Sequence, residues 1–330
     1  MIAKIIRNRN WKVAGGIKGG NRLQSTAAAT PTPPFRTHVA ANTPTTQTFY
    51  DKDSSTWTYV LHCPRTLQAA VIDPVLDYDS NSGHVSTQSA DGLLAHISTS
   101  KLDVRHILET HAHADHLTAA RYLRHHLHAP VSIGKRIVDV QRTFGPKYNL
   151  SLESLQGSFD GLLDDGETIS LGDCSGSVIH LPGHTPDHVG YVFGGHVFTG
   201  DSIFLAPTHT ARADFPGGVA SQLESSIDRL MSLAGDTKLF VGHDYPGDGK
   251  QVSCSTTVAD QLLLNDHLKM DHFAQFRMEK DSSLNTPKLL HPAIQFNIRG
   301  GRLPPADEDG VSRMRIPITT KPAYHAGIIS

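Results

Sequence analysis

The sequence predicts an α/β protein in which sheets and helices form a layered sandwich. Short runs rich in β-branched and aromatic residues alternate with stretches whose apolar residues recur at helical spacing. Several of the strand-like runs lead directly into glycine-containing loops, which is typical of sheets covered by helices. Apolar residues make up 38% and charged residues 19% of the 330 residues, as in an ordinary globular enzyme.

The first elements of the chain alternate between strand and helix. Residues 56–63 (TWTYVLHC) and 68–75 (QAAVIDPV) predict two strands, joined by the turn-like PRTL. Residues 87–100 carry apolar side chains at helical spacing, and residues 104–110 (VRHILET) predict the next strand. Residues 117–127 (LTAARYLRHHL) then resume a helical period.

The later elements continue this alternation. Residues 175–182 (SGSVIHLP) predict one strand, and residues 190–201 predict two strands about a Gly-Gly turn. Residues 238–245 (KLFVGHDY) predict a further strand. Helices are expected over residues 220–234 and within residues 258–280.

Composition divides the chain into three parts. The first part, residues 1–46, is basic, rich in Ala, Ser and Thr, and free of acidic residues, which is typical of a mitochondrial transit peptide. The alternative for this part is a disordered tail without an address. Residues 47–281 form the predicted globular domain, and the proline-rich residues 282–330 form a mostly irregular extension that wraps it. We expect a mitochondrial matrix location, with a cytoplasmic one as the alternative.

Charge and cysteine content exclude several classes of function. The net charge of −2 gives no overall attraction to nucleic acid or to an anionic membrane. No run of 18 apolar residues is present, which argues against a membrane span. Cys63, Cys174 and Cys254 are far apart and odd in number, so the sequence predicts a reducing compartment and has no C-x-x-C motif.

The stretch ETHAHADHLTAA, residues 109–120, predicts a metal site. It places His111, His113, Asp115 and His116 within six positions directly after a predicted strand. Imidazole and carboxylate are ligands of zinc and iron(II), and a cation among them offsets the cost of crowding and burying them. No turn or capping requirement explains this string.

Three further candidate ligands stand where an apolar strand enters a glycine-containing loop. They are His184 in LPGHTPDH, Asp201 in FTGD and His243 in FVGHDY. The chain has 21 histidines, most of which we expect to be solvated or hydrogen-bonded, and His184 or His243 taken singly is more often structural. Only the combination predicts a closed metal site.

With these pieces in order, the chain resembles metallo-β-lactamase-fold proteins of the glyoxalase II and persulfide dioxygenase branch. The resemblance covers residues 48–305 and rests on THAHADH, PGHTPDHVGY, FTGD, ARADFPGG and GHDYPG. It implies an αββα sandwich with the metal between the edges of the two sheets, and a catalytic domain over residues 47–281.

The resemblance implies two alternative chemistries. In dinuclear hydrolases, two Zn(II) ions activate a water that attacks a thioester, lactone or lactam. The implied ligands of one zinc are His111, His113 and His184, those of the other are Asp115, His116 and His243, and Asp201 bridges both. In persulfide dioxygenases, one Fe(II) per chain is held by His111, His184 and Asp201, which leaves positions for a persulfide sulfur and O₂. These three residues are the implied catalytic set.

The motifs favour the dioxygenase. ETHAHADHLTAARYL and ARADFPGG read closer to persulfide dioxygenases, and GHDYPGDGK replaces the acidic-Tyr-Thr sequence expected in glyoxalase II. The leading hypothesis is therefore an iron-dependent sulfur dioxygenase that converts a low-molecular-weight persulfide, glutathione persulfide above all, to sulfite and free thiol. The zinc hydrolase is the alternative, and a metal-binding protein without turnover is a third.

Substrate contacts are predicted at two side chains. Arg212 offers its guanidinium to a substrate carboxylate, or alternatively pairs with Asp214. Tyr245 donates a hydrogen bond to the substrate, or alternatively packs in the core. Asp187 is expected to orient a ligand imidazole or to cap a turn. The expected partners are a small thiol or persulfide and O₂, without nucleic acid or membrane, and the protein is a possible homodimer.

Overall fold

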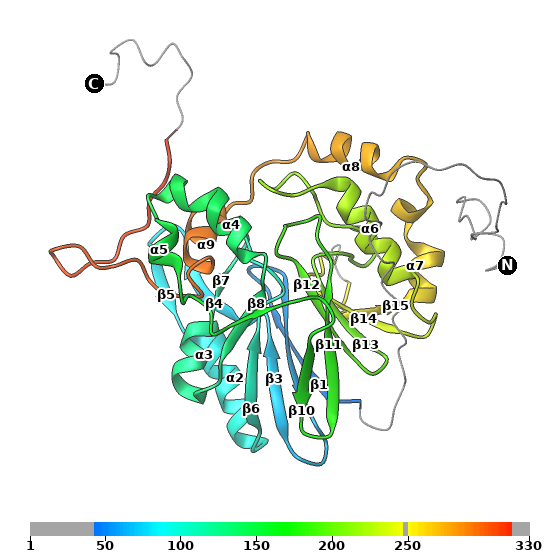
Figure 1. Ribbon diagram of the computed structural model, residues 1–330, viewed down its shortest axis with the longest axis horizontal. Coiled ribbons are helices and arrows are strands. Elements are labelled where there is room, and N and C mark those ends of the chain that lie inside the picture. The colour runs from blue at the N-terminus through cyan, green and yellow to red at the C-terminus, as the bar shows by residue number, and fades with distance from the viewer. Residues whose placement is uncertain (1–42, 247–249, 319–330) are drawn as a thin grey trace, which may run out of the picture. The chain divides into compact units, whose positions relative to one another are not determined.

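The computed structural model describes residues 43–246 and 250–318 (Figure 1). Most of the predicted presequence, residues 1–42, lies outside the described residues, as do residues 319–330 of the predicted extension. The first strand, β1, begins at Thr45. Within the described ranges, every helix is too short or too polar to cross a membrane.

One sheet holds the strand that leads into the predicted metal motif. Its order is β1-β2-β3-β6-β8-β9. β1 to β3 are antiparallel neighbours, and β3, β6, β8 and β9 run parallel. The bounds are β1 Thr45–Asp51, β2 Thr56–His62, β3 Gln68–Ile72, β6 Asp103–Leu108, β8 Val131–Gly134 and β9 Gly161–Leu163. Beside it, β4 (Val75–Asp79) pairs with β5 (His84–Ser86) and β7 (Leu117–Thr118).

The second sheet holds the strands that lead to the other candidate ligands. Its order is β10-β11-β12-β13-β14-β15, in which only the pairing of β13 with β14 is parallel among the described strands. The bounds are β10 Thr168–Leu171, β11 Cys174–His180, β12 Val189–Phe193, β13 His196–Gly200, β14 Lys238–Val241 and β15 Ser255–Thr257.

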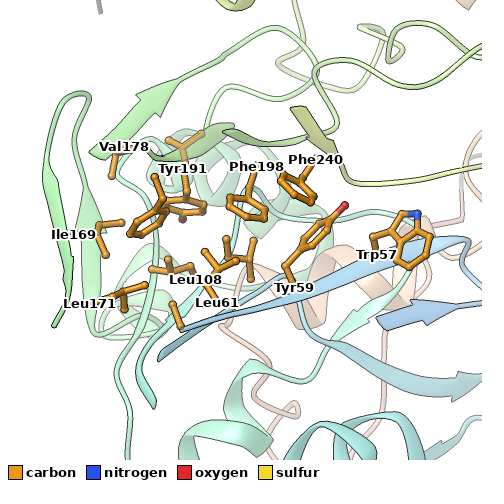
Figure 2. Close-up of a cluster of buried hydrophobic side chains, with 14 of the residues drawn as sticks. Trp57, Tyr59, Leu61, Leu108, Ile169, Leu171, Val178, Tyr191, Phe198 and Phe240 are labelled. Carbon is orange, nitrogen blue, oxygen red and sulfur yellow. The ribbon is translucent and has the colours of Figure 1, made fainter. Parts of the chain in front are cut away.

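The two sheets pack face to face through apolar and aromatic side chains. Figure 2 shows Tyr59 and Leu61 of the first sheet facing Tyr191, Phe198 and Phe240 of the second. All five are nearly inaccessible to solvent. Because side chains alternate along a strand, the same strands present their other residues to the helices outside.

Helices cover the outer faces of both sheets, so the layers run helix, sheet, sheet, helix. Figure 1 shows α2 (Gln88–Thr99) and α3 (Ala120–Leu127) beside the first sheet, and α6 (Ala220–Met231) and α7 (Val258–Leu264) beside the second. Leu93 of α2 and Leu123 of α3 pack with outward side chains of the first sheet. The remaining helices are α4 (Ile137–Phe144), η1 (Gly145–Tyr148), α5 (Leu152–Leu155), η2 (Asp266–Lys269), α8 (Phe273–Asp281) and α9 (Leu290–Asn297). The predicted αββα sandwich is confirmed.

Two segments differ from the expectation. The helical pattern over residues 258–280 is divided into α7, η2 and α8. Asn265 interrupts it with an extended backbone, because its side chain accepts a hydrogen bond from the His267 N–H at 3.0 Å and donates to the His209 carbonyl at 3.2 Å. His272 follows in the left-handed conformation, with φ of 60°, and begins the next helix.

The second difference is α9, a helix within the proline-rich segment that the pattern predicts to be irregular. Pro292 lies in its first turn, where no intrahelical donor is required. Phe296 packs with the helices outside the first sheet. Ile294 and Ile298 join a third apolar cluster with residues of α4.

Candidate metal centre

The candidate ligands converge at the carboxyl ends of four strands. The six-residue motif follows β6, His184 follows β11, Asp201 follows β13 and His243 follows β14. The predicted ligands are therefore brought together from both sheets, and all but Asp115 are less than 10% exposed. The seven residues of this group are His111, His113, Asp115, His116, His184, Asp201 and His243.

His111, His184 and Asp201 form one group of potential ligands. The Oδ2 atom of Asp201 lies 3.8 Å from Nε2 of His111 and 3.8 Å from Nε2 of His184. One ligand atom of each of the three residues lies within 4.8 Å of the others. Two imidazoles and one carboxylate on one side of a cation are the ligand set of non-haem iron(II) oxygenases.

His113, Asp115 and His116 form a second group, with ligand atoms again within 4.8 Å of one another. His243 lies between the groups, because its Nε2 atom is 3.5 Å from Oδ2 of Asp115 and 3.2 Å from Oδ2 of Asp201. Asp201 is thus close to the other members of the first group and to His243, which in turn approaches Asp115 of the second group.

Hydrogen bonds made by Nδ1 of the candidate histidine ligands determine whether Nε2 is available to bind a metal. Nδ1 of His184 donates to the Arg212 carbonyl at 2.8 Å, and Nδ1 of His243 donates to the Ser55 carbonyl at 3.1 Å. Because a carbonyl oxygen can only accept, each of these rings carries its proton on Nδ1 and leaves the Nε2 lone pair available.

His111 is oriented in the same way through Thr110. The Thr110 hydroxyl donates to Oδ2 of Asp73 at 2.8 Å and is therefore available to accept from Nδ1 of His111 at 3.0 Å. The backbone N–H of Thr110 donates to the other oxygen of Asp73 at 2.7 Å. Asp73 thus fixes both the backbone and the ring at the start of the motif.

The side chains fit a cation, because several buried ligand atoms have no hydrogen-bond partner among the described residues. These atoms include Nε2 of His111, Nδ1 of His113, Nε2 of His116 and Oδ1 of Asp201. Buried polar atoms are almost always paired, so a cluster of unpaired ligand atoms indicates a partner that they share. A divalent cation satisfies all of them at once.

A buried carboxylate pair lies on the far side of His113. Its Nε2 atom is 3.1 Å from Oδ1 of Asp73 and 3.6 Å from Oε2 of Glu109. Burial opposes the charged form of His113, but attraction by Asp73 and Glu109 outweighs it and raises its pKa to about 10. Burial, reinforced by Asp73, raises the pKa of Glu109 to about 8.

His188 supports Asp201 and is not among the closest ligands. Nε2 of His188 accepts a hydrogen bond from the Asp201 N–H at 2.9 Å, and its ring stacks on His111 at 4.8 Å between centroids. Burial, together with His184, lowers the pKa of His188 to about 3. The ring is therefore neutral and accepts the Asp201 N–H.

The predicted substrate contacts have other partners. The Arg212 guanidinium pairs with both oxygens of Asp214, at 2.6 and 2.7 Å, and donates to the Asn285 carbonyl at 2.8 Å. This is the alternative expected for Arg212, a pair that shapes the loop. Tyr245 is 46% exposed and its ring stacks on His243. Tyr245 is therefore a side chain at the rim of the centre.

Asp187 acts on the backbone of the motif. Its Oδ2 atom accepts from the N–H of Ala112 at 2.8 Å, between the first two histidines. The expected contact of Asp187 with a ligand imidazole is absent from its hydrogen bonds among the described residues. Gly242 is required by space, because a Cβ there would lie 2.2 Å from Oδ1 of Asp201.

Several side chains that support the centre were not predicted from the sequence: Asp73, Glu109, Thr110 and Asn297. Asp73 carries the clearest sequence signal, because it ends an apolar strand in VIDPV. Asp73 follows strand β3, and the neighbouring strand β6 leads into the metal motif. The ends of these two strands lie side by side only because of the register of β3 with β6, which the sequence does not show.

The fold and the convergent ligands define a metal-dependent enzyme of the αββα class. Residues 52–243 match the model of the metallo-beta-lactamase superfamily, and the chain belongs to this family.

Relatives in this family carry different names. A beta-lactamase hydrolase-like protein of Xylella fastidiosa is 42% identical over 283 residues, which cover 84% of this chain and 66% of that protein. Glyoxylase B2 of Dictyostelium discoideum is 39% identical over 280 residues, which cover 82% and 96%. The mitochondrial persulfide dioxygenase ETHE1 of Homo sapiens is 28% identical over 255 residues, which cover 76% and 87%.

The fold of this chain is also similar to that of a solved structure. The crystal structure of ETHE1 from Myxococcus xanthus aligns with a TM-score of 0.63 at 29% identity, and the match covers 78% of this chain and 100% of that chain. The comparisons establish the family and its metal-dependent character, while the names of the relatives divide between hydrolases and dioxygenases.

Proposed function

We propose that the protein is an iron-dependent dioxygenase of a low-molecular-weight persulfide, with glutathione persulfide as the expected substrate. The observation that carries the proposal is the compact group of His111, His184 and Asp201. His113 belongs to a second group with Asp115 and His116, and its ring also lies 4.0 Å from that of His111 between centroids. The structural likeness to ETHE1 of Myxococcus xanthus supports the same assignment.

The proposed reaction converts the persulfide, O₂ and water to the thiol and sulfite, with release of two protons. Iron(II) held by this group would supply electrons for O₂ and open positions for both reactants. The chain itself contributes orientation: the Arg212 carbonyl fixes His184, Thr110 fixes His111, and the His188 ring fixes the backbone of Asp201. All three rings and Asp201 are buried, which limits the access of water to this group.

The alternative is a dinuclear zinc hydrolase of thioesters, lactones or lactams. One observation favours it: Oδ2 of Asp201 lies 3.2 Å from Nε2 of His243 and within 3.8 Å of both histidines of the first group. A carboxylate in this position suits a bridge between two cations. The name of one relative, glyoxylase B2 of Dictyostelium discoideum, is consistent with this alternative.

Metal loading and oxygen uptake test the proposal. The protein is prepared without metal, reconstituted separately with Fe(II) and Zn(II), and assayed with glutathione persulfide in an oxygen electrode. We expect O₂ uptake and stoichiometric sulfite only with iron. Cleavage of a glutathione thioester by the zinc form, with no O₂ uptake by the iron form, would overturn the proposal in favour of the hydrolase.

We further propose a mitochondrial matrix location, because residues 1–46 are basic and free of acidic residues. Fusing these residues to a fluorescent protein tests it: the fusion should colocalise with a matrix marker, and a diffuse cytoplasmic signal would contradict it.

A further inference from the structure

The helix α9, which follows both sheets in the sequence, contacts the metal-binding motif directly. Asn297 is its last residue and is 3% exposed. Its Nδ2 atom donates to the carbonyl of His113 at 2.8 Å and to the carbonyl of His116 at 2.8 Å. Its Oδ1 atom accepts from the backbone N–H of Thr118 at 2.9 Å.

These three bonds use both donors and the acceptor of the amide. A side chain that offers two N–H donors and one oxygen acceptor in one plane is characteristic of Asn and Gln. A carboxylate of the same shape at this position would place an oxygen against the two carbonyls. The environment of Asn297 therefore requires an amide.

The two carbonyls that accept from Asn297 belong to His113 and His116, two histidines of the second ligand group. These residues stand on either side of Asp115 in the sequence. The bonds fix the distance between the His113 and His116 peptides, and with it the directions of the side chains between them. A ligand set held by one side chain from a distant helix is more ordered before a metal arrives, which favours binding.

The helix that carries Asn297 is itself firmly placed. Ala293, Ile294 and Phe296 are almost fully buried between the first sheet and α4. The side-chain amide of Gln141 on α4 donates to the Ile298 carbonyl at 2.9 Å, directly after Asn297. Through its hydrogen bonds, Asn297 therefore holds the metal-binding loop in a fixed position relative to the packed helix α9.

We propose that Asn297 is a positioning residue of the metal centre, so that the segment after the second sheet sets the metal affinity of the motif formed by residues 111–116. The inference requires a metal that is held by the motif. In the mononuclear arrangement Asn297 would act on the iron through the backbone that carries His111, and in the dinuclear arrangement it would also act directly on His113 and His116.

Gln295 provides a matched control on the same helix. It is also 3% exposed, and its amide also makes three bonds to backbone groups. Its Nε2 atom donates to the carbonyls of His291 and Arg315, and its Oε1 atom accepts from the N–H of Arg315. None of its described hydrogen bonds reaches the metal motif. Asn297→Ala and Gln295→Ala therefore remove comparable interactions at different places.

The test measures affinity for Fe(II), Zn(II) and Co(II) by competition with a chelator, on the full chain. We expect Asn297→Ala to weaken binding about 10- to 100-fold, the range for residues that orient metal ligands. Gln295→Ala should stay within about threefold of the wild type, although both variants lose thermal stability in the metal-free form. The Co(II) absorption spectrum should shift only in Asn297→Ala.

Two outcomes would overturn the inference: unchanged affinity in Asn297→Ala, or an equal loss of affinity in both variants. If Asn297→Ala does not fold, the isosteric Asn297→Asp serves instead, since it keeps the packing and removes both donors. Because affinity is measured with three metals and without substrate, a failure of the dioxygenase proposal would leave this result intact.

Discussion

At the scale of single residues, His113 separates the two metal arrangements. Its Nε2 atom faces Asp73 and Glu109, while His111 and His184 form the ligand group that includes Asp201. In a mononuclear centre, His113→Ala should keep an iron content close to that of the wild type, whereas His184→Ala should lose it. Elemental analysis of both purified variants checks this. Complete loss of iron in His113→Ala would count against the mononuclear arrangement.

The residues of the motif were predictable because their chemistry is local. Imidazoles at positions 111, 113 and 116 with an aspartate between them have few explanations other than a metal. Asp73 and Asn297 were not predicted, because their roles depend on contacts with residues far away in the chain. Asn297 lies 184 positions from His113, and no local pattern encodes that contact.

At the scale of elements, α8 anchors the loop that orients His184. Arg277 and Asp281 form a buried ion pair on α8, with both side chains 2% exposed. Oδ2 of Asp281 accepts the Ala213 N–H at 2.7 Å, next to the Arg212 carbonyl that holds His184. The pair therefore links the helix to the metal centre.

Asp281→Ala should destabilise the metal-free protein by about 3–5 kcal/mol, because it leaves the Arg277 charge buried without its partner. Urea unfolding measures this. Adding Arg277→Met should recover part of the loss, because the uncompensated charge is removed with it. Arg313 and Asp309, an exposed pair at the same i,i+4 spacing, provide the control, and Asp309→Ala should cost less than about 1 kcal/mol. Equal effects at both sites would contradict the anchoring role.

Helices and strands were predicted where their periodicity reflects burial. Residues 220–234 and 87–100 place apolar residues on one face, and α6 and α2 form there. The division after α7 was not predicted because Asn265 and its partner His209 meet only in the folded chain. The helix α9 was missed because prolines dominate its local composition, although Pro292 falls in the first turn.

At the scale of the whole molecule, the pH dependence of stability should reflect buried neutral histidines. His267 on η2 is 4% exposed. Burial lowers its pKa to about 3, and Lys280, His209 and Arg277 act in the same direction, opposed by Asp266. Since the folded pKa lies below the unfolded value of about 6.5, the unfolded state binds the proton first as the pH falls. Stability should therefore be full above about pH 6.5 and decline below it.

The decline that this single group contributes between pH 6.5 and pH 5 is at most about 2 kcal/mol. Urea unfolding of the metal-free protein at pH 7, 6 and 5 measures it. The variant His267→Gln should show a shallower decline than the wild type, because its side chain does not titrate. Identical slopes for the two proteins would show that the His267 ring is readily protonated in the folded state.

The metal centre should also hold the two sheets together. Its candidate ligands come from the first sheet through the motif after β6, and from the second through His184, Asp201 and His243. A cation bound by both sets stabilises the folded state, because the unfolded chain does not hold the ligands together. At free metal about 100-fold above the dissociation constant, this stabilisation is about 2.7 kcal/mol.

Removal of the metal with a chelator should therefore lower Tm by about 5 °C or more, as measured by scanning calorimetry. Restoring the metal should reverse the shift, and the size of the shift should grow with the free metal concentration. Asp201→Asn, which removes the negative charge of a candidate ligand close to His111, His184 and His243, should reduce this response. An equal Tm with and without metal in the wild type would mean that the cation does not link the two sheets, and that packing between aromatic side chains such as Tyr59 and Phe198 carries the interface alone.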